Sequence, residues 1–501
     1  MGFSIFEDQC APDGFSHVKR VGIVGAGVAG LQTARLLREK GFDCTIFEKS
    51  NDVGGVWREN YADFGLQVPR ELYEFPGFPY PKDQDFNLFP SGPQVQNYIQ
   101  SYATAYNLMD IIRFGTQVLA LTPFTKNGAD AWEVRFATAE GMEFVEHYDF
   151  CVVSTGMYSN APNLPRARGQ ELFEGSILHS CTFQDKEQVK GKRVLVVGGG
   201  KSAVDNAVSA AKVGVSSTLL FREAHWPVPR YLLNLIPFKW GTYSRFGHFM
   251  LHTYHEVSPL TWWFHCFLAP LKWFFWRVVE LMFCLQFGLS GDALPQTPIE
   301  IDLFTGGQIL NYEYRDMLSK GQVASRKGAI DYFLKDGVVL VDGTKLEVDV
   351  VIYGTGFRKN YDILDEVTQR KLEVAKDGLY LFRNIIPPTV PNLAFIGSEV
   401  STFNNILTHG LQALWLQRLL TGGFALPKQG SMQRSVEKEQ SWKRSWMPAS
   451  SARASIWQLH MMQYHDNLCK DMGVRNRRKG WNLAAEAFAP YSAADYKDLF
   501  H

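Results

Sequence analysis

The chain contains 501 residues, and its 51 Lys and Arg balance its 51 Asp and Glu, so the formal net charge is zero. This balance gives no general reason to expect nucleic acid or a charged surface as a partner. The length predicts two or three domains with large cores. The seven cysteines contain no C-x-x-C pair and no metal-ligand cluster. They favour a reducing, cytoplasmic setting without a metal site, and they argue against disulfide reductases.

Residues 1–17 are mixed and polar, so no signal peptide is predicted. The following stretch, from Arg20 to Ser50, predicts the order strand, glycine turn, helix, strand. The turn reads GAGVAG, a G-x-G-x-x-G pattern that suits a tight turn, close approach of a pyrophosphate, and packing of helix on strand. Glu48 follows the second strand, where a carboxylate can accept hydrogen bonds from ribose hydroxyls. These features predict a dinucleotide site formed by Gly25, Gly27, Val28, Ala29, Gly30, Glu48 and Lys49.

A second copy of this unit begins at residue 192 and reads KRVLVVGGGKSAVDNAVSAAKVGVSSTLLFRE. Its loop has glycine at the first two key positions and alanine at the third. The candidate contacts to a second dinucleotide are Gly198, Gly200, Lys201, Ser202 and Ala203.

The two units differ in the charge at the end of their second strand. Phe47 is followed by Glu48, whereas Phe221 is followed by Arg222. A carboxylate suits a free ribose hydroxyl, and an arginine suits a 2′-phosphate through its planar, permanently charged fork. We therefore expect FAD at the first loop, and NADPH in preference to NADH at the second.

Between the two units, residues 173–183 read FEGSILHSCTF, which fits the pattern F-x-G-x-x-x-H-x-x-x-aromatic. Here the chain resembles the flavin-containing monooxygenases, whose fingerprint has this form and lies just before the second glycine loop. The related Baeyer–Villiger enzymes usually end the pattern with tryptophan, so phenylalanine at this position favours oxygenation of a heteroatom. The resemblance implies that the histidine holds the domain linker rather than transferring protons. The fingerprint residues are Phe173, Gly175, His179 and Phe183.

The resemblance covers most of the chain and is closest to the long plant-type members. It implies that GGVW at 54–57 lies against the flavin nucleotide, and that STG at 154–156 and GTGF at 354–357 are crossovers between two domains. It also implies that NLAFIGSEV at 392–400 delivers a glycine to the flavin, and that the next helix aims its N-terminus at the flavin ring. The cofactor-binding residues implied in these and neighbouring segments are Gly55, Val56, Trp57, Val118, Thr155, Gly156, Thr355, Gly356, Gly397, Thr408 and Gln412.

Gln67, in LQVPRELYEF, occupies a place where many members of the family have asparagine near the reactive face of the flavin. It keeps an amide donor on a longer arm, so it is the candidate catalytic residue, and a surface glutamine in a loop is the alternative. The resemblance implies that NADPH reduces FAD, that oxygen forms a hydroperoxide at the flavin C4a atom, and that an amine nitrogen or a sulfide sulfur takes one oxygen atom. N-hydroxylation of an amino acid, Baeyer–Villiger ester formation, and a non-catalytic nucleotide-binding sensor or scaffold remain open.

The predicted fold is an α/β structure with two Rossmann-like dinucleotide-binding domains, each discontinuous in sequence. We expect the FAD domain at residues 15–165 and 356–430, and the NADP domain at residues 170–355. An aromatic-rich helical insertion is expected at 231–295, and a C-terminal extension at 431–501.

The insertion is unusual in composition, since 17 of the 60 residues at 231–290 are aromatic and only six are charged. Its longest uncharged run, VSPLTWWFHCFLAPL, is short for a bilayer span. Three interpretations remain open: a lid and tunnel over the flavin, an aromatic face in a membrane interface, and a core between domains. Residues 428–480 carry 11 basic and four acidic residues, which predicts a solvated face, with contact to anionic lipid as the second interpretation.

Overall fold

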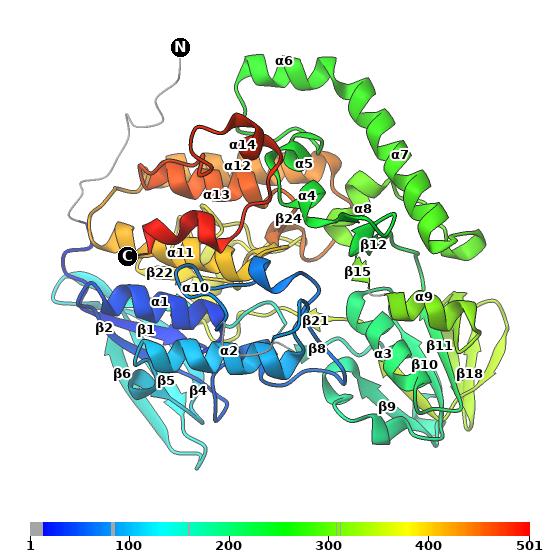
Figure 1. The fold of residues 1–501 in the computed structure, drawn as a ribbon. Coiled ribbons are helices and arrows are strands. Elements are labelled where there is room, and N and C mark those ends of the chain that lie inside the picture. Colours follow the sequence, from blue (N-terminus) through cyan, green and yellow to red (C-terminus); the bar gives the residue numbers. More distant parts are fainter. Residues whose placement is uncertain (1–13, 82–85, 159–160, 307, 311, 501) are drawn as a thin grey trace.

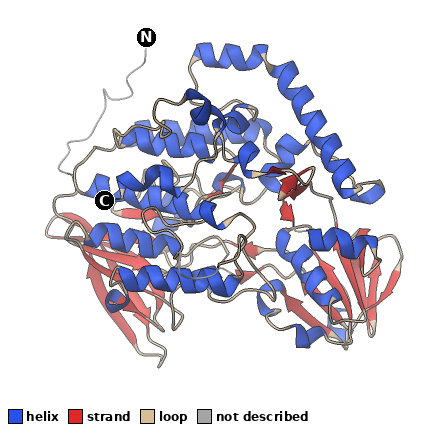
Figure 2. Ribbon diagram, viewed as in Figure 1, coloured by secondary structure: helices blue, strands red, loops and turns tan. Residues whose placement is uncertain are grey.

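The computed structural model describes residues 14–81, 86–158, 161–306, 308–310 and 312–500. Figure 1 shows two sheet-based units, at the lower left and the lower right, beneath a layer built from the middle and the end of the chain. Figure 2 shows that most strands gather in these two units and that the upper layer is mainly helical. The protein is therefore a mixed α/β structure with two separate parallel sheets.

The first unit contains the first glycine loop. Its elements are β1 (Arg20–Val24), α1 (Val28–Arg38), β2 (Asp43–Phe47), α2 (Gly92–Ala105), β3 (Ile112–Arg113), β4 (Gln117–Lys126), β5 (Ala129–Ala137), β6 (Glu143–Tyr148), β7 (Phe150–Val153), β22 (Leu393–Phe395) and α11 (Asn405–Leu420). The parallel sheet has the order β22-β7-β1-β2-β3, and β4-β5-β6 form an antiparallel sheet beside it. β1 has the sequence RVGIV, and its last four residues are buried, as expected for a central parallel strand that is covered on both faces.

The second unit contains the second glycine loop. Its elements are β9 (Ser176–His179), β10 (Arg193–Val197), α3 (Lys201–Ala211), β11 (Ser216–Phe221), α9 (Tyr312–Ser319), β16 (Val323–Lys327), β17 (Ile330–Leu334), β18 (Gly337–Leu340), β19 (Lys345–Glu347) and β20 (Val350–Tyr353). The order β9-β20-β10-β11-β16 matches the first sheet strand for strand, with β10 in the place of β1. The antiparallel sheet β17-β18-β19 likewise corresponds to β4-β5-β6. The repeated glycine loop is thus part of a repeated domain.

Two chain passages connect the units and lie side by side. β8 (Ala161–Pro162) follows the first parallel sheet, and β21 (Phe357–Arg358) follows the second. They pair as antiparallel strands, so the segment that leads into the second unit is hydrogen-bonded to the segment that leads back to the first.

The segment between β11 and α9 contains the predicted insertion at 231–295 and a few residues on either side of it, and it is called the insertion from here on. It supplies the outermost helices of the upper layer (Figure 1). Its elements are β12 (Pro227–Pro229), β13 (Tyr231–Leu232), β14 (Ile236–Pro237), α4 (Lys239–Thr242), α5 (Arg245–Phe249), α6 (Pro259–Phe267), α7 (Ala269–Phe287), α8 (Ile299–Thr305) and β15 (Gln308–Leu310). Among the described residues, no helix is both long enough and apolar enough to cross a membrane.

The last part of the chain returns to the first unit and covers it. Its elements are α10 (Glu366–Leu372), β23 (Ser401–Thr402), α12 (Gln429–Trp446), β24 (Ile456–Gln458), α13 (Met461–Asp471) and α14 (Leu483–Phe488). β24 pairs in parallel with β23, and α13 packs against α11. Residues of the first unit, the insertion and this extension share one hydrophobic core.

Candidate active site and cofactor sites

Each glycine loop is closed by the carbonyl oxygen of the chain passage that leaves the neighbouring strand. Gly25 has φ +106°, and a Cβ there would lie 2.7 Å from Ser154 O, just after β7. Gly198 has φ +147°, and a Cβ there would collide with Gly354 O, just after β20. Both the backbone conformation and the lack of space require glycine at these positions.

The third position of the two loops is filled differently. A Cβ on Gly30 would collide with Gly25 O, so α1 packs directly on its own loop. In the second loop Ala203 takes this place, and Gly354 makes room for its methyl group, since a Cβ on Gly354 would lie 2.6 Å from Ala203 Cβ. The alanine in the second pattern is therefore compensated by a glycine in the crossover.

The middle glycines leave both helix N-termini open. α1 and α3 begin after Gly27 and Gly200, and neither helix receives a side-chain cap from the described residues. Their first N–H groups can therefore bind a phosphate, which the helix dipole also favours. A Cβ on Gly200 would have no atom within 4 Å, and one on Gly27 would lie 3.7 Å from Gly55 Cα. The geometry fits a pyrophosphate at each loop, with Val28 and Ala29 beginning the first helix.

Glu48 directly follows β2, with its carboxylate turned to the first glycine loop. Its Oε2 accepts from Ala26 N at 2.7 Å, and its Oε1 accepts from Ser50 N at 2.9 Å. The residue is 6% exposed, whereas Lys49 beside it is exposed. The acid thus already binds the loop backbone, and its contact to a ribose stays a prediction.

Arg222 directly follows β11, the strand that corresponds to β2. It is exposed and makes no hydrogen bond or ion pair with any residue in the described part of the chain. Strand register pairs Phe221 with Lys327 of β16, which brings a second cationic residue to the same sheet edge. Sequence reasoning missed Lys327, because only the register of two strands a hundred residues apart places it there.

The start of α3 is tied to the first unit. Lys201 forms an ion pair with Asp205 one turn later, and Tyr61 donates to Asp205 Oδ2 at 2.9 Å. Ser202, between them, is half-buried. Tyr61 and Asp205 carry no motif, so the sequence did not indicate this contact between units.

The apolar fingerprint residues pack around the linker. A Cβ on Gly175 would collide with the Phe173 ring and with Asp349 O, so glycine lets the linker approach β20. The rings of Phe173 and Phe333 lie 5.3 Å apart, and Phe183 is fully buried in the core of the second unit.

His179 connects the fingerprint to the second crossover. Its Nε2 lies 2.9 Å from Gly356 O, and its Nδ1 accepts from Cys181 N at 3.2 Å. Burial lowers the pKa of His179, so the ring is neutral and donates from Nε2. Thr355 Oγ1 donates to Asn163 O at 2.5 Å, which joins the two crossovers.

Several residues predicted to bind FAD lie around the first glycine loop. Trp57 Nε1 donates to Tyr73 Oη at 2.7 Å, and Val56 beside it is 43% exposed. Val118 of β4 is buried in the same cluster as Phe47 at the end of β2. Thr155 and Gly156 follow β7, and Gly156 has φ +72° with open space at its Cβ position.

Gly397, Thr408 and Gln412 form a buried network instead of an open surface. Gly397 N donates to Gln412 Oε1 at 3.0 Å, and Gln412 Nε2 donates to Tyr464 Oη at 2.7 Å. Thr408 Oγ1 lies 2.8 Å from His465 Nε2. The two α11 side chains therefore hold the Gly397 turn against α13, and their contact with flavin stays a prediction. Tyr464 and His465 were missed because nothing local in the extension marks them.

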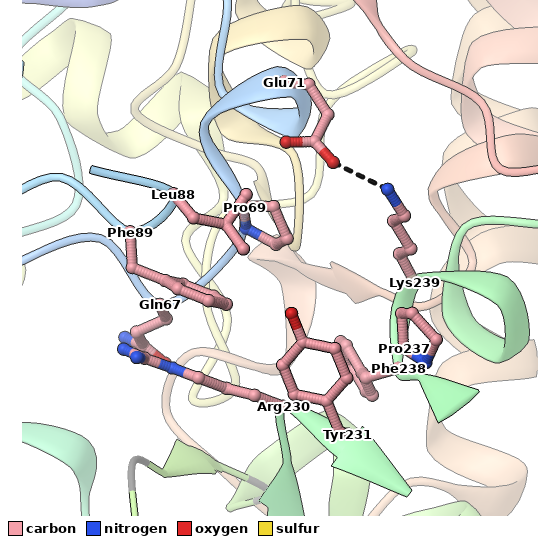
Figure 3. Close-up of a pocket in the computed structure, with 10 residues that line it drawn as sticks. All are labelled: Gln67, Pro69, Glu71, Leu88, Phe89, Arg230, Tyr231, Pro237, Phe238 and Lys239. Carbon is pink, nitrogen blue, oxygen red and sulfur yellow. Dashed lines mark hydrogen bonds and ion pairs between the residues drawn. The ribbon is translucent and has the colours of Figure 1, made fainter. Parts of the chain in front are cut away.

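Gln67 lines a cavity of about 60 Å³ where the first unit meets the beginning of the insertion (Figure 3). Its amide makes no hydrogen bond to any described residue. The Arg230 guanidinium lies 3.7 Å from the centroid of the Phe89 ring, and Lys239 Nζ pairs with Glu71 Oε1 at 2.7 Å. The remaining lining residues are Pro69, Leu88, Tyr231, Pro237 and Phe238. The first part of the insertion thus forms one wall of this cavity.

The chain matches known proteins over most of its length. The family described as flavin-binding monooxygenase-like matches residues 18–483. A probable flavin-containing monooxygenase 1 of Arabidopsis thaliana is 32% identical, and the alignment covers 95% of this chain and 96% of that protein. Flavin-containing monooxygenase 3 of Macaca mulatta is 28% identical, with coverage of 91% and 83%.

Solved structures share the fold at low sequence identity. S-allyl-L-cysteine S-oxygenase from Allium sativum has a TM-score of 0.63 and 20% identity, with 91% of this chain and 89% of that chain covered. OTEMO in complex with FAD and NADP has a TM-score of 0.66 and 19% identity, with coverage of 90% and 97%. The family match over residues 18–483, on a fold with two glycine loops suited to pyrophosphates, identifies this chain as a member of the flavin-binding monooxygenase-like family, an NADPH-dependent monooxygenase with FAD and NADPH as cofactors.

Proposed function

We propose that this chain transfers one oxygen atom from O2 to an amine nitrogen or a sulfide sulfur of a small molecule. FAD reduced by NADPH supplies the activation of oxygen when it is bound. The observation that supports the proposal is the cavity at Gln67, which combines one amide, apolar side chains and the charged groups of Glu71, Arg230 and Lys239 within a flavin monooxygenase fold. The chain binds the cofactors, orients the substrate and keeps water away.

Each cofactor has its own set of residues in this proposal. The N-terminus of α1, with Gly27 and Glu48, holds the FAD nucleotide, and the N-terminus of α3, with Gly200 and Arg222, holds NADPH. Gln67 donates its amide N–H at the reacting face. His179 acts through the linker: its bond to Gly356 O fixes the crossover between the two sites.

The cavity walls also suggest the substrate. Leu88, Phe89 and Phe238 suit an apolar amine or thioether. Lys239 pairs with Glu71 in the same lining, and a substrate that also carries a carboxylate would take the place of Glu71 as its partner. An amino acid with a thioether or amine function combines both features. We therefore expect a higher kcat/KM for such a substrate than for its decarboxylated analogue.

The test uses the purified FAD-loaded chain, NADPH and isotopically labelled oxygen, with an amine or a sulfide as substrate. The expected result is one labelled oxygen atom in an N- or S-oxygenated product. In the Gln67→Ala variant, product per NADPH consumed falls about tenfold or more, because an amide donor at the reacting face is lost. Gln67→Asn retains most of this coupling, and Gln296→Ala, at an exposed glutamine of the insertion, leaves it unchanged.

Two outcomes would contradict the proposal. A lactone from a cyclic ketone, without product from amines or sulfides, would indicate a Baeyer–Villiger enzyme instead. Peroxide equal to the NADPH consumed, with no oxygenated product from any substrate, would indicate that oxygen transfer does not occur.

A further inference from the structure

Helices α6 and α7 reverse the usual polarity of a surface helix pair. The buried side chains include three polar ones, His265, Lys272 and Gln286, beside Phe283. The exposed side chains are large and apolar, with exposed fractions between 38% and 81%. We call this set the outer apolar face; it consists of Leu260, Trp262, Trp263, Phe264, Phe267, Leu271, Trp273, Phe274, Val278, Leu281 and Leu285. Contiguous apolar surface of this kind marks an interaction site.

The buried polar groups fix the orientation of the helix pair. Lys272 Nζ donates to Leu251 O at 2.6 Å and lies 2.9 Å from His265 Nδ1. Gln286 Nε2 donates to Tyr231 O at 2.8 Å, and its Oε1 accepts from Leu233 N at 2.9 Å. Turning the apolar side inward would leave these groups without partners, which is costly. The outer apolar face is therefore held outward by the fold.

The apolar surface continues onto α5 and α14. The Phe275 ring of α7 lies 6.1 Å from the Phe246 ring of α5, which lies 5.4 Å from the Phe488 ring of α14. Leu483, in α14, and Trp481, just before it, are 74% and 94% exposed. Figure 1 shows α5, α6 and α14 together in the upper part of the molecule, with α7 running down from α6.

An exposed cation adjoins this surface, and a second exposed cation lies two residues from it in the chain. Arg475 and Arg477 are exposed and form no ion pair with any described residue, whereas Arg478 and Lys479 pair with aspartates. The Arg475 guanidinium lies 5.9 Å from the Trp481 ring. The surface thus combines exposed tryptophans with positive charge, as membrane-interface segments do.

We propose that the outer apolar face, together with Trp481 and Leu483, lies in the headgroup–acyl boundary of a bilayer that contains anionic lipid. Tryptophan suits this boundary because its ring is apolar and its N–H is polar. Arg475 and Arg477 contact the lipid phosphates and give a preference for anionic lipid. The start of the insertion lines the Gln67 cavity, whereas its helices α6 and α7 carry the outer apolar face, so one inserted segment contributes to both sites. This inference does not depend on the oxygenation reaction.

The experiment is co-flotation of the full FAD-loaded chain with vesicles of phosphatidylcholine, alone or with about one-quarter phosphatidylserine. We expect binding to both, and stronger binding when phosphatidylserine is present. The combined variant Trp263→Ser, Phe267→Ser, Leu271→Ser loses binding to both vesicles about tenfold or more, because apolar area no longer leaves water. Arg475→Gln with Arg477→Gln loses only the preference for phosphatidylserine.

A matched control changes three exposed valines outside this surface, and this variant should float like the unmodified chain: Val215→Ser, Val341→Ser and Val367→Ser. Flavin content and the thermal midpoint report whether each variant folds. A second measurement needs no variant: bromine-labelled lipids should quench part of the tryptophan emission of the unmodified chain.

Three results would overturn the inference. The first is absence of both flotation and quenching. The second is a dimer in vesicle-free buffer that the serine variant converts to a monomer, which would place a second copy of the chain on this face. The third is a changed KM for a small sulfide in vesicle-free buffer without vesicle binding, which would place the face in the active-site lid. Failure of the oxygenation assay alone would leave the flotation result standing.

Discussion

Glu48 and Arg222 stand one residue beyond equivalent strands and carry opposite charge. Glu48 is buried and binds its own glycine loop, whereas Arg222 is exposed and makes no hydrogen bond or ion pair with the described residues. A carboxylate at the strand end would repel a 2′-phosphate on the ribose at the first site, while the glycine loop itself stays open to a pyrophosphate. A free guanidinium at the second loop can take a phosphate without first breaking another contact.

Arg222→Ala should raise the KM for NADPH tenfold or more and leave the KM for NADH nearly unchanged. The reason is that a charge-assisted contact to the 2′-phosphate is worth about 1.5–3 kcal/mol. Lys327→Ala should act in the same direction with a smaller effect, because a lysine binds phosphate as a point charge. Steady-state kinetics with both nucleotides measures the ratio.

The control for these variants is Lys345→Ala, at an exposed cation on the antiparallel sheet of the same unit. An unchanged ratio of NADPH to NADH efficiency in Arg222→Ala would reject a phosphate site at this strand end.

The residues of the loops could be predicted because their roles are local. A turn that needs positive φ, or a helix that packs on a strand, leaves glycine at a fixed spacing. The role of Gly354 could not be predicted in this way, because it makes room for Ala203, which lies 151 positions earlier in the sequence. Lys327 and Tyr464 were not predicted for the same reason. Strand register places Lys327 and tertiary packing places Tyr464, and neither kind of contact leaves a local sequence pattern.

The N-termini of α1 and α3 offer a matched pair of substitutions. Gly27 and Gly200 have φ values of −79° and −86°, which alanine also adopts, and neither lies in a crowded place. Gly27→Ala should give a folded protein that loses FAD, because the added methyl group blocks the pyrophosphate. Gly200→Ala should keep FAD and raise the KM for NADPH about tenfold or more. Flavin absorbance, thermal unfolding and NADPH kinetics separate the two effects.

Gly198→Ala is the structural contrast. It should lower the thermal midpoint, because its Cβ collides with Gly354 O and its φ is positive. If Gly27→Ala retained FAD with normal affinity, or if Gly200→Ala left NADPH kinetics unchanged, the assignment of the loops would be wrong.

The roles of the helices in the insertion could not be predicted from the sequence. Its aromatic composition indicated an unusual segment, and three interpretations followed from composition alone. The structure divides the segment: α6 and α7 present apolar side chains outward, whereas the residues that line the Gln67 cavity are Arg230, Tyr231, Pro237, Phe238 and Lys239. Composition cannot distinguish these uses, because the outward face is decided by polar contacts such as that of Lys272 with Leu251 O.

A group of buried histidines joins the insertion to the C-terminal extension. Burial lowers the pKa of His248 and His465 to about 3, and that of His255 to about 4. Burial also holds the pKa of His460 well below its usual range. Such a histidine is neutral in the folded chain, so the stability it contributes is present above its unfolded pKa and lost as the pH falls below it.

The thermal midpoint should therefore fall between about pH 7 and about pH 5, before most carboxylates titrate. For His460, which is 1% exposed, the loss approaches about 1.4 kcal/mol for each pH unit below its unfolded pKa. Glu74 acts in the opposite sense, since burial raises its pKa to about 7. His460→Phe should reduce the loss, because phenylalanine keeps the contact with Phe304 without a titrating group. An equal loss in this variant, or a loss only below about pH 4.5, would contradict the explanation.

The overall architecture was predictable because the two glycine units are repeats. The two parallel sheets correspond strand for strand, and the fold with two dinucleotide-binding domains is confirmed by the family match and the structural neighbours. The way the C-terminal extension covers the first unit was not predictable. It depends on buried contacts such as Thr408 with His465, which join segments without a shared pattern.

The proposed reaction requires that electrons pass between two unlike nucleotide sites, from NADPH at the Arg222 loop to FAD at the Glu48 loop. Anaerobic mixing of the FAD-loaded chain with NADPH, followed by flavin absorbance, measures this exchange. We expect one FAD per chain and loss of the oxidised flavin absorbance, much faster with NADPH than with NADH. Flavin absorbance that does not change, or that decays equally fast with both nucleotides, would contradict the proposal.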